Sequence, residues 1–551
     1  MRPSLSAWIV LSLGVVAACP VGGASAAPNP YTAAAKVDEL LVKEIPPTAD
    51  DGDKKADDAA WAPSDDETYL RRVALDITGR SPTPEEITAF VLDPSPAKRH
   101  RIIDKLLERT SYGENWARYW RDVILSRRSD ERSLFVAPAL VSYLTEQFNR
   151  DTSWDTIARA FITATGDISS NGATAIFMAQ LADPANVTAE MSRIFLGVQI
   201  QCAQCHDHRT DRWKREQFHE LAAFFPRVAI RRDGAGGGPP SFRVVSLDRG
   251  GGPRAPGVQE KVTPEHYMPD LEDPTAQGKL MQPVFFATGQ KLPRGKSDKE
   301  RRGTLADWMT NAGGQRWFAK ALVNRLWGEL VGRGFFDPID DLGPDRQPTA
   351  PQTLEYLADQ FVASGYDVKW LFRAIVSTEA YGRAGRSRHD ADASPVACSC
   401  PQRLRADQLY DALASTLGLP EDNRPPRDGR PRRYLDGPRG SVLRTFGFDP
   451  SAPRDELGGS IPQALMLMNS PEVNRSINGR RGDTMLGKLL AETKDDEAVV
   501  TELYLRSLAR EPSPAELQTC LDHVRTVGNR SAAHEDILWS LVNSTEFLHR
   551  K

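Results

Sequence analysis

The sequence predicts a mainly α-helical protein, with two helical domains joined by a short junction that is rich in Gly and Pro and contains strands. Two observations carry this prediction. Apolar residues recur at helical spacing on both sides of the chain's middle, as Tyr69, Leu70, Val73 and Ile77 do at i, i+1, i+4 and i+8. Between these stretches, residues 233–257 contain runs of Gly and Pro that interrupt regular structure.

The helices of the first half have recognisable start signals. Thr83 is placed to cap a helix that begins at Pro84, and Asp183 to cap one that begins at Pro184. We assign residues 27–66 to an N-terminal helix and a charged connector, and residues 67–230 to the first helical domain. Further helices are predicted over 36–45, 97–108, 115–125, 138–149 and 154–164.

The junction is assigned to residues 231–302. Within it, Phe242–Leu247 and Val284–Ala287 are typical of short strands. Lys291–Arg302 is dense in charge and is expected to be a linker.

The second helical domain is assigned to residues 303–551, because helical periodicity resumes at Leu305. Arg424–Gly440 contains six Arg and is expected to be a solvated loop. Helices are predicted over 317–331, 351–363, 368–377, 406–416, 460–468, 485–490, 498–508, 514–527 and 534–542.

Composition excludes several classes of protein. The chain has 551 residues, 70 Lys+Arg against 74 Asp+Glu, and 40% hydrophobic residues. That apolar fraction is sufficient for a core, and six Cys are too few for a disulfide scaffold. The net charge of −4 argues against a nucleic-acid partner. We expect instead a redox or cell-surface protein partner, which the sequence does not identify, and it does not decide whether the protein is an enzyme.

The first residues predict export to the periplasm or the cell surface. Met1-Arg2 is followed by an apolar run over Leu5–Ala18 and by the cleavage pattern Ala24-Ser25-Ala26, which defines a signal peptide over residues 1–26. Cys19 follows Val16-Ala17-Ala18 and is an alternative site for a lipid anchor. No other run approaches the length of a membrane span, so none is expected in the mature chain.

The segment with the clearest chemistry is Cys202-Ala203-Gln204-Cys205-His206-Asp207-His208. It contains C-x-x-C-H, the attachment signature of c-type haem. In this interpretation Cys202 and Cys205 form thioethers with the haem, and His206 is the proximal ligand of its iron. We expect the segment to lie at the end of the helix that begins at Pro184. Export supports the interpretation, because c-type haem is attached outside the cytoplasm.

Zinc is the main alternative to haem. Cys202, Cys205 and His208, with His219 or Asp207, form a set of ligand types that zinc prefers. A zinc site would indicate a cell-surface interaction module or an enzyme that acts on a surface polymer. A C-x-x-C disulfide or a packing role stays open as well.

The second axial ligand of a haem is not determined by the sequence. The candidates are Met178, Met191, His219, Met268 and Met281. Downstream of the motif, aromatic and apolar residues at helical spacing are expected to be core, with the wall of a cofactor pocket as the alternative; they are Trp213, Phe218, Leu221, Phe224 and Phe225.

Several blocks resemble a known pair of domains. FLGVQIQCAQCHDH (195–208), with DRW and FHELAAFF after it, and YLRRVALDITGR (69–80) resemble the planctomycete cytochrome-like domain of unknown function. NRLW (324–327), LRADQLYDA (404–412) and PQALMLMN (462–469) resemble the planctomycete-specific companion domain that follows it. The resemblance implies membership of this family, whose activity is not settled and whose cytochrome-like name rests on the same C-x-x-C-H motif.

The sequence departs from the family pattern at two places. Arg209-Thr210 stands where Pro-Phe usually follows His-Asp-His, and Thr349-Ala350-Pro351 stands where the family has Ser-His-Pro. If the family's His takes part in a site, that site is incomplete in this chain.

Other polar residues are expected to be structural. Asp337, Asp340 and Asp341 are interpreted as loop-fixing acids, with Asn324 and Arg325 as their buried partners. Cys398 and Cys400 are too close in sequence to form an unstrained disulfide with each other, so one of them is a candidate partner of Cys520, or both are metal ligands.

Overall fold

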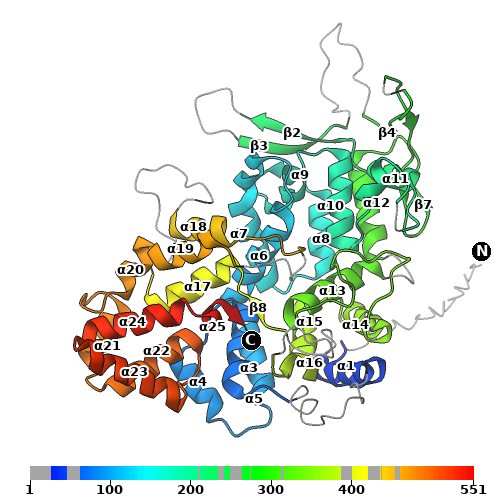
Figure 1. The fold of residues 1–551 in the computed structure, drawn as a ribbon. Coiled ribbons are helices and arrows are strands. Elements are labelled where there is room, and N and C mark those ends of the chain that lie inside the picture. The colour runs from blue at the N-terminus through cyan, green and yellow to red at the C-terminus, as the bar shows by residue number, and fades with distance from the viewer. Residues whose placement is uncertain are drawn as a thin grey trace, which may run out of the picture.

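A computed structural model describes residues 27–45, 62–208, 211–233, 241–248, 264–273, 275–311, 316–385, 400–419, 435, 437–452 and 459–550. The fold is mainly α-helical, as the sequence predicts. Figure 1 shows helices throughout the described residues, with strands β2, β3 and β4 along one edge and β8 near the centre. The predicted signal peptide, Cys19, the acidic connector over 50–58 and Cys398 lie outside the described residues.

The helices of the first half begin where polar side chains cap them. Asp65 caps α3 and Asp183 caps α10, and Thr83 forms a capping box with Glu86 at the start of α4. The elements are α1 (Pro30–Glu44), α3 (Asp66–Thr78), α4 (Pro84–Val91), α5 (Lys98–Leu107), α6 (Thr110–Leu125), η1 (Glu131–Val136), α7 (Ala137–Asn149), α8 (Trp154–Thr163), η2 (Gly172–Thr174), α9 (Ala175–Ala179), α10 (Pro184–Leu196), η3 (Gln201–Gln204) and α11 (Arg215–Ala222).

The strands of the junction form short antiparallel pairs, and one sheet also includes a strand from the first half of the chain. A three-stranded sheet has the order β1-β3-β2, with Val244 of the central strand opposite both Gly166 and Ile230. The predicted strand at Phe242–Leu247 is β3, whereas only two residues of Val284–Ala287 are a strand. The strands are β1 (Gly166–Asp167), β2 (Val228–Asp233), β3 (Ser241–Ser246), β4 (Tyr267–Met268), β5 (Lys279–Leu280), β6 (Val284–Phe285) and β7 (Gln290–Lys291).

The charged linker predicted over Lys291–Arg302 is wrong in its last residues, which form the start of a helix. Asp298 and Arg302 are buried and pair with each other one turn apart, so their charges stabilise α12 instead of marking a loop. This part of the chain contains α12 (Asp298–Thr310), α13 (Trp317–Val331), α14 (Pro351–Ala363), α15 (Val368–Val376) and α16 (Glu379–Gly382).

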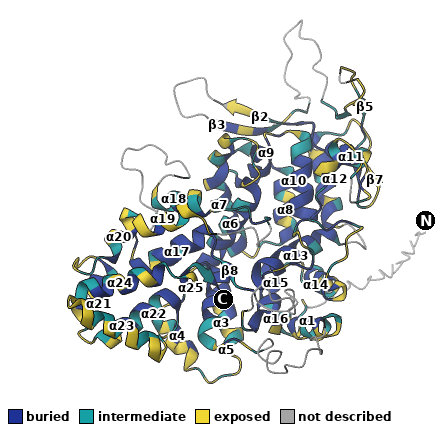
Figure 2. Cartoon of the chain, viewed as in Figure 1, coloured by how far each residue is buried: buried dark blue, intermediate teal, exposed yellow. Residues whose placement is uncertain are grey.

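Helices α12–α16 pack into the same hydrophobic core as the first half of the chain. A second core is formed by Leu75 of α3 and by the helices from α17 onward. Figure 2 shows both cores as buried ribbon enclosed by exposed helix faces. The last elements are β8 (Gln402–Arg403), α17 (Ala406–Leu417), α18 (Gly437–Phe446), α19 (Ile461–Asn469), α20 (Pro471–Ile477), α21 (Met485–Glu492), α22 (Asp496–Leu508), α23 (Pro514–Val527), α24 (Arg530–Val542), α25 (Thr545–Leu548) and β9 (His549–Arg550).

The loop predicted over Arg424–Gly440 ends earlier than expected. Its last residues belong to α18, and Arg439 pairs with Asp407 and Asp411 of α17. Among the helices of the described ranges, none combines the length and the apolarity needed to cross a bilayer.

Candidate functional site

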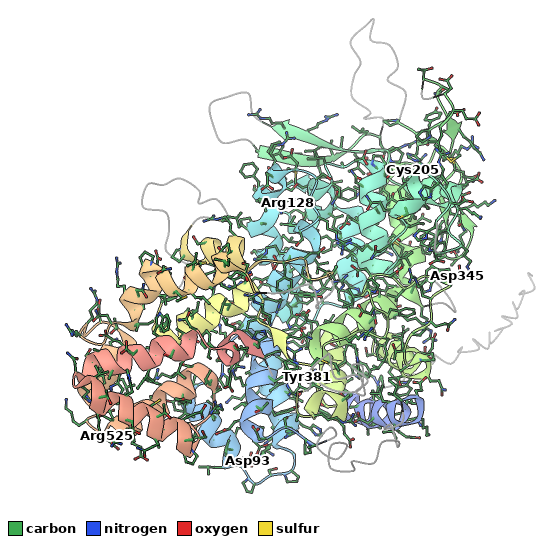
Figure 3. The ribbon with its side chains drawn as sticks, viewed as in Figure 1. Asp93, Arg128, Cys205, Asp345, Tyr381 and Arg525 are labelled. Atoms are coloured by element: carbon green, nitrogen blue, oxygen red, sulfur yellow. The ribbon has the colours of Figure 1, made fainter. Side chains whose placement is uncertain are left out.

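The C-x-x-C-H segment lies on a separate turn and not on the end of α10, so the expected placement is wrong. Gly197 ends α10 in the left-handed conformation with φ of 64°, a backbone state that costs glycine least. The chain then forms the 3-10 turn η3, which contains Cys202. Figure 3 labels Cys205, the residue that follows this turn.

The turn points its reactive groups outward. Cys202, Cys205 and His206 are exposed, whereas Ala203 between the cysteines is fully buried and anchors the turn. Both thiols are free, so no disulfide joins them. Two thiols that have no partner in the described chain are therefore accessible to an external group.

His206 is held in one tautomer. Its Nδ1 lies 2.7 Å from the carbonyl oxygen of Asp207, which only accepts hydrogen bonds, so Nδ1 carries the proton. In the neutral ring Nε2 is then the nitrogen without a hydrogen, and it is the one available to a metal. Metal-binding histidines usually donate their second ring N–H in this way.

Asp207 ties the turn to the start of α11. Its carboxylate accepts from the backbone N–H of Arg215 at 3.0 Å and from Lys214 Nζ at 2.9 Å. Both bonds lower the pKa of Asp207, and the bond from the Arg215 backbone has the larger effect. A carboxylate at a helix N-terminus is favourable, so Asp207 has a structural role here.

His219 is buried below the turn, and both of its ring nitrogens have partners. Nε2 lies 3.0 Å from the carbonyl oxygen of Gln204, and Nδ1 lies 2.9 Å from Nε2 of His266. Burial lowers the pKa of His219, and it lowers the pKa of His266 to about 4, so both rings are neutral near pH 7.

These contacts bear on both cofactor hypotheses. The backbone N–H of His208 donates to the carbonyl oxygen of Trp213 at 2.8 Å. Within the described part of the chain, no three His, Cys, Asp or Glu side chains are grouped so that they would hold a metal ion. Zinc ligation by Cys202, Cys205, His208 and His219 would therefore require His219 to give up one of its two hydrogen bonds.

The candidate second axial ligands differ in accessibility. Met178, Met191 and Met281 are each at most 2% exposed. Met268 lies in β4, two residues after His266, and is partly exposed. The downstream aromatic set is core as predicted, because all five side chains are buried.

Two family models match parts of the chain. PSCyt2, a protein of unknown function (DUF1549), matches residues 53–229, and PSD1, a protein of unknown function (DUF1553), matches residues 301–439. The chain contains a domain of the PSCyt2 family followed by a domain of the PSD1 family. The order of the two domains confirms the resemblance seen in the sequence. Comparison with curated proteins and with solved structures found no match.

A pair of carboxyl groups joins the PSCyt2 domain to the PSD1 domain beside the turn. The backbone N–H of Arg212 donates to Asp211 Oδ1 at 2.8 Å and to Asp345 Oδ2 at 2.9 Å. Burial and the neighbouring Asp345 raise the pKa of Asp211, although the Arg212 N–H and His208 oppose the change. Asp345 is labelled in Figure 3.

Sequence reasoning missed this carboxyl pair. The two residues are far apart along the chain, and neither has a spacing that marks a site. The available signals are that Asp211 begins the DRW block and that Asp345 follows the loop acids Asp340 and Asp341.

The loop acids of the PSD1 domain are structural, as expected, with one correction. Asp340 is 2% exposed and accepts from Arg325 and from Arg193 Nη1, the latter at 3.0 Å. Burial opposes ionisation of Asp340, but the two guanidinium groups lower its pKa. Asn324 bonds to the main chain of Phe336 and Ile339, and not to the acids as predicted.

Two of the remaining cysteines lie in different parts of the fold, Cys400 just before β8 and Cys520 in α23. Cys400 is buried, and its backbone N–H donates to Val331 at the end of α13. Cys520 is a free thiol in α23 whose sulfur lies 4.0 Å from Tyr504 Oη. Cys520 is therefore not in a disulfide with Cys400.

Proposed function

We propose that the protein is an exported haem c-binding, electron-transfer protein. The observation that carries the proposal is the turn itself. It presents two unpaired thiols three residues apart, followed by a histidine whose Nδ1–H is already donated to Asp207, which leaves Nε2 for a metal. A bound haem c would supply a one-electron iron couple.

The thiols fit covalent attachment. Each thiol would add across one haem vinyl group, with a carbon–sulfur bond formed, the thiol hydrogen passed to the other vinyl carbon, and nothing released. Because Cys202 and Cys205 are exposed on a surface turn, no core side chain has to move for both sulfurs to react.

His206 is the proposed proximal ligand, and Met268 is the proposed second one. Among the five sequence candidates, Met268 alone is partly exposed, whereas His219 is committed to Gln204 and His266. Lys214 and Arg215 donate hydrogen bonds to the Asp207 side chain and so hold this residue in place. Its carbonyl oxygen, which accepts from His206 Nδ1, therefore keeps the His206 ring in one orientation.

The deciding experiment is expression of the chain with its leader in a host that has the haem-attachment machinery, and again in one without it. We expect one haem per chain, retained on a denaturing gel and seen as a Soret band, only in the first host. Cys202→Ser and Cys205→Ser should each lose one thioether and weaken retention, and the double variant should lose the haem. Cys520→Ser is the matched control, because that thiol lies on another helix, and should retain full loading.

The ligand assignment has a separate readout. Met268→Ala should change the absorption spectrum of the loaded protein without releasing the haem, and Met191→Ala should not change it. A colourless protein with one zinc per chain, lost when Cys202 and Cys205 are alkylated, would replace the haem proposal with the zinc alternative.

A further inference from the structure

A cavity of about 390 Å³ lies between the two domains, away from the turn. Tyr69, Arg99 and His100 line it from the PSCyt2 side, and Ser377, Glu379 and Arg383 line it from the PSD1 side. Its volume is at the lower end of the range of about 300–1,000 Å³ that small-molecule sites occupy. It is therefore large enough for a compact organic molecule.

The walls are held in place by the fold. The segment 62–64 pairs with residues 382–384, through Ser64 N–H to the carbonyl of Gly382 and Ala384 N–H to the carbonyl of Ala62. Arg99 donates to the carbonyl of Ser64 at 2.9 Å, and its guanidinium lies 4.2 Å from the centre of the Tyr69 ring. His100 stacks on Tyr31 of α1. The cavity is consequently preformed.

Among the described residues of the lining, positive charges outnumber negative ones. Two guanidinium groups, those of Arg99 and Arg383, face one carboxylate among the described lining residues, that of Glu379. The Glu379 side chain is 72% exposed and lies 3.6 Å from Arg383, whose own side chain is 7% exposed. Asp66, 3.6 Å from Arg99, also pairs with Lys98 and is not part of the lining. Arg383 also interacts electrostatically with Asp38 of α1, which is not part of the lining. An oxyanion in the cavity would accept charge-assisted hydrogen bonds from the guanidinium groups of Arg99 and Arg383.

A buried hydroxyl in the same lining lacks a hydrogen-bond partner. Ser377 Oγ is almost inaccessible to solvent and bonds to no group of the described chain. Leaving such a donor unsatisfied is unfavourable, so native structures usually supply a partner. An acceptor atom in the cavity would supply it.

We propose that this cavity binds a compact organic molecule that carries an oxyanion, either a carboxylate or a sulfate. Arg99 and Arg383 hold the oxyanion by charge-assisted hydrogen bonds, and Ser377 donates to an oxygen of the same molecule. The rings of Tyr69 and His100 form the less polar wall. The proposal is independent of haem attachment, because none of its residues belongs to the turn.

Binding is tested on the full mature chain by calorimetry and by thermal stability at constant ionic strength. The probes are D-glucuronate, a sulfated monosaccharide, inorganic sulfate and the uncharged D-glucose. We expect saturable binding of at least one charged sugar and none of glucose. Weaker binding of inorganic sulfate at the same site supports an organic ligand, and equal or tighter binding of inorganic sulfate overturns that part of the proposal.

Variants locate the site. Arg383→Gln and Arg99→Gln should each weaken binding at least tenfold, and Ser377→Ala several-fold, whereas Arg132→Gln, which alters an exposed arginine on η1, should have no effect. Glu379→Gln removes the competing carboxylate from the surface without disturbing a buried group, and it should strengthen binding. Equal affinities across all five variants, or no binding of any charged probe to the wild-type chain, would overturn the proposal.

Discussion

Asp211 is a single side chain whose ionisation affects the contact between the two domains. Its raised pKa means that the folded state favours the protonated carboxyl, so its contribution to stability is fully present below the ordinary pKa of 3.8 and is lost as pH rises through the raised value. We therefore expect Asp211→Asn to be more stable than the wild type at neutral pH, by about 0.5–1 kcal/mol after solvent screening. Denaturant unfolding from pH ~4 to pH ~8 checks this; identical pH profiles for the two proteins would contradict it.

Gly343 leaves the space that Asp211 occupies. A Cβ at Gly343 would lie 1.6 Å from Asp211 Oδ2, so an added methyl group must push the carboxyl group away from the Arg212 N–H. We expect Gly343→Ala to cost about 1–2 kcal/mol of unfolding free energy. Gly303→Ala is the matched control, since a Cβ there meets nothing within 4 Å inside α12, and it should be neutral or stabilising by up to about 1 kcal/mol. Equal losses in both variants would show that the carboxyl contact is unimportant.

What the sequence predicts about single residues depends on how local the signal is. C-x-x-C-H is contiguous, so Cys202, Cys205 and His206 were found without a structure. The tautomer of His206 was not found, because it depends on the backbone conformation at Asp207. The contact of Asp211 with Asp345 forms only when the two domains pack against each other. The periodicity of a single segment does not show which distant segments pack together.

Helix α1 contributes the N-terminal cap that α14 lacks. Ala350 at the N-cap position of α14 has no capping side chain, but Glu44 of α1 accepts from the backbone N–H of Gln352 at 2.7 Å and of Thr353 at 2.9 Å. We expect Glu44→Ala to destabilise the protein by about 1–2 kcal/mol, because two helix N–H groups lose their partner. Thermal or denaturant unfolding measures the loss.

Glu39 is the control on the same helix. Among the described residues it pairs only with Lys36 and Lys43, on the exposed face of α1, so Glu39→Ala should leave the unfolding midpoint unchanged. If the two alanine variants unfolded alike, the loss would reflect the helix propensity of α1 and not the cap on α14.

Helix starts were predicted well where a cap precedes an apolar stripe and poorly where charges are buried. The helix at Pro84 and the helix over 317–331 match the predicted positions. The start of α12 was interpreted as a linker because Asp298 and Arg302 look like solvated charges in the sequence. Arg439 was assigned to a loop for the same reason, although Asp407 and Asp411 bind it to α17. The pattern of charges in a sequence does not show whether a charged side chain is solvated or pairs with another side chain.

Buried ion pairs hold the whole molecule together at two separate places. Asp340 lies between Arg193 of α10 and Arg325 of α13, inside the first core. Asp407 of α17 binds Arg121 of α6 at 2.6 Å and therefore connects the second core to the first. Removing Asp340 takes a counter-charge from the buried Arg325, while Arg193 still pairs with Glu190. Removing Asp407 leaves Arg121 paired with Asp122.

We expect Asp340→Asn to cost about 3–5 kcal/mol of unfolding free energy. Asp337→Asn, in the same loop, should cost at most about 0.5 kcal/mol, because Asp337 and its partner Arg333 are both more than 40% exposed. The pKa of Asp340 is lowered, so its contribution is present above pH 3.8 and is lost as pH falls through the lowered value. The difference between the two variants should accordingly shrink in acid.

The two buried groups should differ in which part of the molecule they protect, and hydrogen exchange of the folded protein distinguishes them. Asp407→Asn should accelerate exchange in α17 and the helices that pack on it, while α10 and α13 stay protected, because it weakens the link between the cores and leaves the first core intact. Asp340→Asn should accelerate exchange in α10 and α13 first. Uniform acceleration in both variants would mean that the two cores open as one unit, and that the buried pairs set global stability without dividing the molecule.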